Sequence, residues 1–128
     1  MVGWKAQPAN LMFTVTKEFH FEAAHSLPHL PVGHKCRNLH GHSYRVRVEV
    51  DGQPDERGFV VDYAEIAAAV DPIIARLDHK NLNELLFGRA STAENLAEWI
   101  YNVTKPLLPA ITRIAVSETR KTWVIYAP

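Results

Sequence analysis

The amino-acid sequence predicts a single domain of the α+β class. Residues 12–21 and 43–50 alternate between apolar and polar side chains, which is the period of antiparallel strands with one wetter face. Two further stretches, after Asp62 and after Ser91, carry apolar residues at helical spacing and lie together in the middle of the chain. Helices grouped beside strands of this kind favour α+β over an alternating α/β arrangement.

Composition limits the functions to be considered. The 128 residues are 47% hydrophobic, and the zero net charge gives no global field that would attract nucleic acid or an anionic membrane. The single cysteine cannot form an intrachain disulfide, no apolar run approaches the ~18 residues of a membrane span, and the first residues do not resemble a signal peptide. We therefore expect a cytoplasmic protein, with residues 1–11 as an N-terminal extension and residues 12–128 as one domain.

Each predicted strand has an apolar face. In residues 12–21 one face carries Phe13, Val15, Lys17, Phe19 and Phe21. In residues 43–50 one face carries Tyr44, Val46, Val48 and Val50, and the other carries Arg45, Arg47 and Glu49. The intervening residues 23–41 are rich in His, Pro and Gly, and a loop of that length in a small domain is usually functional. Residues 51–58 predict a turn, after which GFVVD continues as a further strand.

Capping signals mark the two helices. Asp62 and Glu65 have the spacing of a capping box, although Asp71-Pro72 predicts a kink or a restart within the helix that follows. The second helix is expected to begin near Ser91, in another capping box, and to end before Pro106.

The end of the chain predicts a closing pair of strands. Residues 111–118 and 122–126 are interpreted as two strands around Arg120-Lys121, which indicates a hairpin. The expected order of elements is therefore β-β-(β)-α-α-β-β.

Six of the seven histidines fall within residues 20–42. His40 and His42 are two apart at the start of the second strand, so their side chains project to the same side. If the first two strands are antiparallel neighbours, His25 at the end of the first meets both. Three histidines with an open position are typical of a catalytic zinc. His20, His29 and His34 are rivals for the third position, and an isolated H-x-H pair is often only two surface histidines.

Cys36 permits several interpretations. As a fourth ligand it would close the metal site and make it structural, although such sites usually carry two or more thiolates. A lone buried cysteine is most often a small hydrophobe. Lys35 and Arg37 flank the thiol, however, and neighbouring cations favour the reactive thiolate. Asp78, His79 and Glu118 would not be selected from the residues alone, because a turn Asp-His pair and a strand-end Glu are usually solvated.

Taken together, the motifs resemble those of the 6-pyruvoyl-tetrahydropterin synthase family. The motifs are F-E-A-A-H, G-H-K-C-x-x-L-H-G-H-S, L-D-H-x-x-L-N, S-T-A-E-N-L-A and a late S-E-T, and they span residues 13–126. The spacing C-x3-H-G-H is similar to that of the bacterial branch that forms 6-carboxy-5,6,7,8-tetrahydropterin in queuosine biosynthesis. The resemblance implies a T-fold (tunnelling fold), with a four-stranded antiparallel sheet carrying two helices on one face. It also implies trimers that close a barrel and stack into a hexamer, with active sites at subunit interfaces.

The resemblance also implies roles for individual residues. His25, His40 and His42 match the zinc ligands, and Cys36 matches the catalytic thiol. Asp78 and His79 match the acid/base pair that works with the thiol. Glu118 matches the carboxylate that anchors the pterin ring, and Thr92 falls in the segment that lines the pterin pocket.

The implied reaction converts 7,8-dihydroneopterin triphosphate to 6-carboxytetrahydropterin, with release of acetaldehyde and triphosphate. It requires Zn²⁺ as cofactor and a thiol that is close to the metal but does not bind it. Two alternatives are a sister activity, either pyruvoyl-forming or dihydroneopterin aldolase-like, and a non-catalytic zinc module with Cys36 as the fourth ligand.

Overall fold

The computed structural model describes residues 11–128, so the extension expected at residues 1–11 lies outside the described residues except for Leu11. In chain order the elements are β1 (Phe13–His25), the 3-10 helix η1 (Lys35–Arg37), β2 (His40–Gly52), α1 (Tyr63–Leu77), β3 (Lys80–Asn81), α2 (Leu82–Leu85), α3 (Ala93–Thr104), β4 (Arg113–Ser117) and β5 (Val124–Tyr126).

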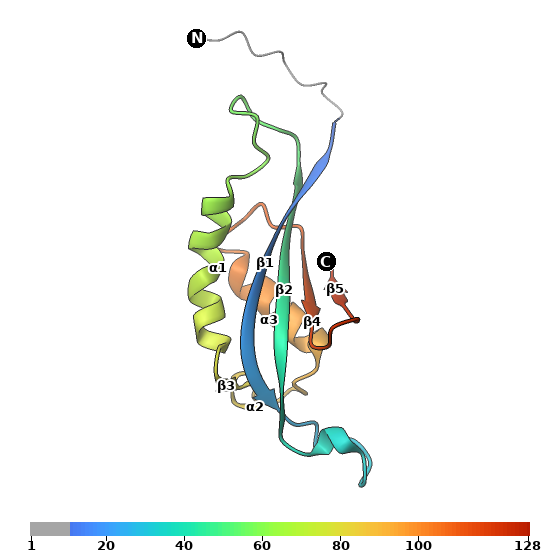
Figure 1. The fold of residues 1–128 in the computed structure, drawn as a ribbon. Coiled ribbons are helices and arrows are strands. Elements are labelled where there is room, and N and C mark those ends of the chain that lie inside the picture. The colour runs from blue at the N-terminus through green and yellow to red at the C-terminus, as the bar shows by residue number, and fades with distance from the viewer. Residues whose placement is uncertain (1–10) are drawn as a thin grey trace.

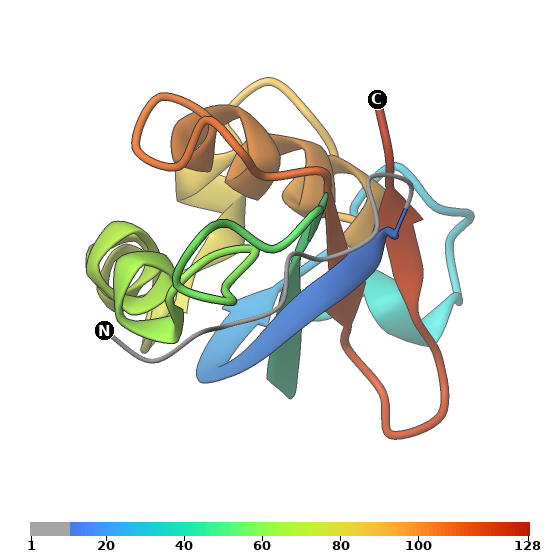
Figure 2. The same cartoon turned by 90° about the horizontal axis from the view of Figure 1, so that it is seen from above.

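One sheet organises the domain, with strand order β3-β1-β2-β4-β5. The pairs β1–β2, β2–β4 and β4–β5 are antiparallel, which confirms the predicted four-stranded antiparallel sheet. The two-residue β3 adds a parallel pairing with β1. Figures 1 and 2 show α1 and α3 together on one side of this sheet, as the α+β class requires.

The core lies between the sheet and the helices. The alternation predicted for the second strand is confirmed, because Tyr44, Val46, Val48 and Val50 are each at most 1% exposed. Burial of each such side chain contributes roughly 1.5–3 kcal/mol. The helices contribute their buried apolar residues to this core, which are Ile66, Val70, Ile73 and Leu77 from α1 and Leu96 and Ile100 from α3.

The predicted strand over GFVVD is wrong, because residues 58–62 form no strand in the structure. The carboxylate of Asp55 accepts hydrogen bonds from the backbone N–H groups of Arg57 and Phe59, and the backbone N–H of Asp55 donates to the Phe59 carbonyl. These bonds close a compact loop. The backbone N–H and carbonyl of Phe59 are therefore used within this loop and are not available for pairing with a strand. Helix α1 begins directly after the loop.

The helix boundaries differ from the predictions in two details. Helix α1 continues through Pro72 without a restart, because the buried stripe on both sides of the proline outweighs the ~3 kcal/mol that a proline costs in a helix interior. Helix α3 has Thr92 rather than Ser91 as its N-cap, and the Thr92 hydroxyl accepts a hydrogen bond from the Asn95 N–H. The side chain of Ser91 is buried and turns toward β1 instead.

Candidate metal centre and active site

The ends of β1 and β2 bring three histidines together. His25 is the last residue of β1 and pairs with His40, the first residue of β2. His42 is two residues further along β2 and projects to the same side. His25 is fully buried, whereas His40 and His42 are half-buried. Antiparallel pairing thus produces the grouping that the sequence analysis favoured.

The ring nitrogens of the three histidines converge. His25 Nε2 lies 3.0 Å from His40 Nε2 and 3.1 Å from His42 Nε2. One nitrogen from each ring lies within 4.8 Å of the other two. Two imidazole nitrogens on one tetrahedral zinc, each ~2.0–2.1 Å from the metal, would be about 3.3 Å apart. The observed spacing is close to that of ligands sharing one ion.

Hydrogen bonds fix the tautomers of two of these rings. His25 Nδ1 lies 2.7 Å from the Ser91 carbonyl oxygen, and His40 Nδ1 lies 2.7 Å from the Asn38 carbonyl oxygen. A carbonyl oxygen only accepts, so each Nδ1 carries the proton and each neutral ring has its lone pair on Nε2. Metal-binding histidines are commonly held in this way. Two lone pairs 3.0 Å apart repel each other, and a cation between them removes the repulsion.

Burial lowers the pKa of His42 from its ordinary value; the nearby carboxylate of Glu118 opposes this, and the charges of His25 and His40 add to it. A histidine must be unprotonated to bind a metal, so this direction suits metal binding. The donor set therefore fits a metal ion. In the described residues, the group whose ligand atoms converge consists of these three histidines and contains no cysteine.

The rival histidines are engaged elsewhere or exposed. His20 is exposed, with its Nε2 3.3 Å from a carboxylate oxygen of Glu18. His34 caps η1 by accepting a hydrogen bond from the Cys36 N–H. His29 is exposed in the loop between β1 and β2.

Glu118 lies beside the histidine triad. It follows β4 directly, and its Oε2 lies 3.9 Å from His25 Nε2. This oxygen is buried and has no hydrogen-bond partner. Arg45 holds the turn that carries Glu118, because its guanidinium donates to the Ser117 hydroxyl and to the Arg120 carbonyl. A buried carboxylate oxygen without a partner is available to a molecule bound next to the triad.

Asp78 and His79 form a pair at the end of α1. His79 Nδ1 lies 3.0 Å from Asp78 Oδ2, while Asp78 Oδ1 accepts a hydrogen bond from the Glu22 N–H at 2.9 Å. The bond from Glu22, followed by that from His79, lowers the pKa of Asp78. The His79 side chain is 79% exposed, and its backbone has a φ of 59°. The carboxylate thus orients an exposed imidazole through its Nδ1 atom.

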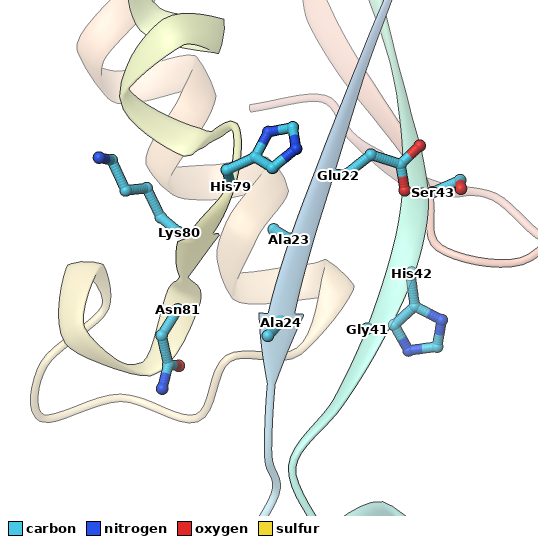
Figure 3. A pocket seen from close by; sticks show the side chains of 9 residues that line it. All are labelled: Glu22, Ala23, Ala24, Gly41, His42, Ser43, His79, Lys80 and Asn81. Atoms are coloured by element: carbon cyan, nitrogen blue, oxygen red, sulfur yellow. Dashed lines mark hydrogen bonds between the residues drawn. The ribbon is translucent and has the colours of Figure 1, made fainter.

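A groove lies between His79 and the segment of β2 that carries His42. His79 and Lys80 line it beside β1, and His42 and Ser43 line it from β2 (Figure 3). Between them lies Glu22, whose carboxylate accepts a hydrogen bond from the Ser43 hydroxyl at 2.7 Å. His79 and the segment of β2 that carries His42 therefore border the same groove.

Cys36 and Thr92 are not among the residues that line this groove. Cys36 is half-buried in η1, where its backbone carbonyl accepts a hydrogen bond from the Leu27 N–H. The guanidinium of Arg37 donates to the carbonyls of Pro28 and Leu30, which ties it to the loop. Thr92 is half-buried, and its hydroxyl caps α3.

Sequence reasoning did not assign a role in the site to two residues that contact it. Asn83 bonds to the backbone of Ser26, next to His25, and Ser91 accepts the hydrogen bond of His25 Nδ1 through its carbonyl. Asn83 is the last residue of the L-D-H-x-x-L-N motif, which was the available signal. The contacts that Asn83 makes are between residues far apart in the sequence, so only the fold shows them.

The fold and the converging histidines define a T-fold protein with a candidate metal centre. A family model described as 6-pyruvoyl tetrahydropterin synthase matches residues 14–128. The chain belongs to this family. In the part of the chain that the structure describes, no helix has the length and apolar character needed to span a membrane.

Individual relatives carry different names within the family. The chain is 40% identical over 115 residues to a 6-carboxy-5,6,7,8-tetrahydropterin synthase of Synechocystis, an alignment that covers 84% of this chain and 88% of the relative. It is 32% identical over 94 residues to a dihydroneopterin monophosphate aldolase of Pyrococcus furiosus, covering 73% and 76%. The structure of a Caenorhabditis elegans 6-pyruvoyl tetrahydropterin synthase matches with a TM-score of 0.84 at 27% identity, covering 92% and 96%.

Proposed function

We propose that the protein is a zinc-dependent carbon–carbon lyase that converts 7,8-dihydroneopterin triphosphate and one molecule of water to 6-carboxy-5,6,7,8-tetrahydropterin, acetaldehyde and triphosphate. This reaction would serve queuosine and other 7-deazapurine biosynthesis in the cytoplasm. The observation that carries the proposal is the convergence of three histidine nitrogens beside the buried, unpartnered Oε2 of Glu118. The name of the Synechocystis relative supports the choice of product.

His25, His40 and His42 would hold Zn²⁺. When bound, the metal would supply Lewis acidity toward the side-chain hydroxyls of the substrate. The two hydrogen bonds from Nδ1 to backbone carbonyls keep His25 and His40 in the tautomer that presents Nε2 to the ion. Glu118 would accept hydrogen bonds from the guanidine-like edge of the pterin and fix the ring so that the side chain reaches the metal.

Proton transfer would use the remaining groups. Cys36, as thiolate, would remove a proton from the substrate side chain, and His79 would return one, with Asp78 keeping the imidazole oriented. Thr92 would line the pterin pocket from the start of α3. The 79% exposure of the His79 side chain supports an active site that is completed by contact between subunits. We therefore propose a homohexamer of two stacked trimers, each chain contributing residues 12–128 as one domain.

Product analysis tests this function directly. The purified chain with Zn²⁺ should release acetaldehyde and triphosphate from 7,8-dihydroneopterin triphosphate, and the pterin product should have the mass of the carboxy compound. Turnover of this substrate without acetaldehyde would reject the proposed reaction in favour of a sister activity. The name of the Pyrococcus furiosus relative makes aldolase-type cleavage the sister activity to assay in parallel, with dihydroneopterin monophosphate as the substrate.

A further inference from the structure

Asn83, on the single-turn helix α2, binds both backbone groups of Ser26. The Ser26 N–H donates to Asn83 Oδ1 at 2.9 Å, and Asn83 Nδ2 donates to the Ser26 carbonyl at 2.9 Å. Ser26 directly follows His25, the most buried of the three converging histidines. The amide of Asn83 therefore bonds to both backbone groups of the residue that follows β1. It replaces the two hydrogen bonds that a paired strand would make there.

Ser91 connects Asn83 to the imidazole of His25. The Ser91 hydroxyl donates to Asn83 Oδ1 at 2.8 Å, and the Ser91 carbonyl accepts the hydrogen bond from His25 Nδ1 at 2.7 Å. Ser91 is 1% exposed, so these bonds lie in a region with little competing water. One side chain thus restrains His25 by two routes, through the peptide that follows it and through the carbonyl that fixes its tautomer.

The segment that carries Asn83, residues 78–83, also hydrogen-bonds to β1 on the N-terminal side of His25. Asp78 Oδ1 accepts from the Glu22 N–H, and the His79 N–H donates to the Glu22 carbonyl at 2.6 Å. Between these ends, β3 pairs in parallel with Ala23 and Ala24. Residues 78–83 therefore run beside residues 22–26 and bind them at both ends. The segment that presents His79 is the segment that locates His25.

We propose that Asn83 is a positioning residue of the metal centre, which sets the place and the tautomer of His25 through Ser26 and Ser91. The inference rests on the proposed metal site but not on the reaction. A purely structural Asn83 would affect the stability of the metal-free protein and leave its affinity for zinc unchanged. A positioning Asn83 alters the affinity and the ligand field of the bound metal.

The test compares Asn83→Ala with the unaltered chain and with Asn102→Ala, a control at an exposed position of α3. Zinc affinity is measured by competition with a chromophoric chelator, and the ligand field is measured from the absorption spectrum of the Co²⁺-loaded protein. We expect Asn83→Ala to bind Zn²⁺ about 10- to 100-fold more weakly and to alter the Co²⁺ spectrum. Asn102→Ala should change neither the zinc affinity nor the Co²⁺ spectrum. Asn83→Asp keeps the acceptor oxygen, so its zinc affinity should lie between those of Asn83→Ala and the unaltered chain.

An Asn83→Ala protein with unchanged zinc affinity and an unchanged Co²⁺ spectrum would overturn the inference, whatever its melting temperature. If this variant does not fold, Ser91→Ala decides, since it removes one hydroxyl and keeps the carbonyl that binds His25. We expect Ser91→Ala to bind Zn²⁺ about 2- to 10-fold more weakly, the range of one hydrogen bond, and an unaltered affinity would overturn the inference. If the unaltered chain itself binds no Zn²⁺, the metal centre fails, which is a separate result from the loss of a positioning role.

Discussion

His25 Nε2 and His40 Nε2 lie 3.0 Å apart, although the Nδ1 atom of each ring already bonds to a backbone carbonyl. In their neutral forms the two rings cannot hydrogen-bond to each other, because each Nε2 has only a lone pair to offer. The fold holds them together nonetheless, through strand pairing and carbonyl contacts. Such a site is destabilised when empty and stabilised by a cation, so metal binding and folding should be coupled.

Zinc should therefore stabilise the folded chain, and His40→Ala should abolish this effect. At a free Zn²⁺ concentration of 1,000 times Kd, linkage predicts an increase of about 4 kcal/mol in the free energy of unfolding. Without zinc, His40→Ala should be no less stable than the unaltered protein, because it removes the repulsion between the lone pairs. Denaturant unfolding with and without Zn²⁺ measures both effects.

His20→Ala is the matched control for that experiment. His20 is exposed and contacts only Glu18 among the ion pairs and hydrogen bonds of the described side chains, so the stabilisation by zinc should persist in this variant. Loss of the zinc effect in His20→Ala, or its survival in His40→Ala, would mean that the metal binds elsewhere.

Replacement of Cys36 should separate catalysis from metal binding. Because Cys36 does not belong to the converging group, Cys36→Ala should retain about one Zn²⁺ per chain, the content expected of the unaltered site. Turnover should fall by about 10²- to 10⁴-fold, the usual contribution of a positioned acid or base. Metal content by atomic absorption and acetaldehyde release are measured on the same preparation. Loss of zinc in this variant would instead support a structural site with a thiolate ligand.

Much of the fold followed from the periodicity of its side chains. The alternation of residues 43–50 predicted the buried face of β2, and the expectation that β1 and β2 are antiparallel neighbours placed His25 opposite His40. Alternation is reliable here because one face of the sheet is buried, so a slip of one residue would turn every apolar side chain to solvent.

The remainder depended on contacts that no local pattern encodes. The two residues of β3 are too few to show a period, and the role of Asn83 arises from a partner 57 positions away. Val60 and Val61 suggested a strand, but the hydrogen bonds of Asp55 close a loop in that place. The resemblance to a family supplied Asp78, His79 and Glu118 as candidates, since neither spacing nor composition distinguishes them from solvated side chains.

Acidification should reveal the contribution of Asp78 to stability. Its pKa is lowered in the folded state, so its stabilising effect is present above the unfolded pKa of ~3.9 and is lost as the pH falls through the folded value. Asp78→Asn cannot titrate, so its stability deficit relative to the unaltered protein should shrink as the pH falls below about 4. Urea unfolding from pH 7 to pH 3 measures this. Asp71→Asn, at an exposed position of α1, is the control, and an equal pH dependence in both variants would contradict the assignment.

The backbone of His79 should make glycine the better substitute at this position. Its φ of 59° lies in the left-handed region, where a non-glycine residue is strained by about 1–3 kcal/mol. We expect His79→Gly to be about 1 kcal/mol more stable than His79→Ala, since relief of this strain exceeds the entropic cost of glycine. Both variants should lose the proposed acid/base function equally. At Lys80, which lies in β3, the order should reverse, with Lys80→Gly less stable than Lys80→Ala. If the alanine variant were the more stable one at both positions, the left-handed backbone of His79 would store no strain. The orientation of its imidazole would then be set by the bond to Asp78 alone.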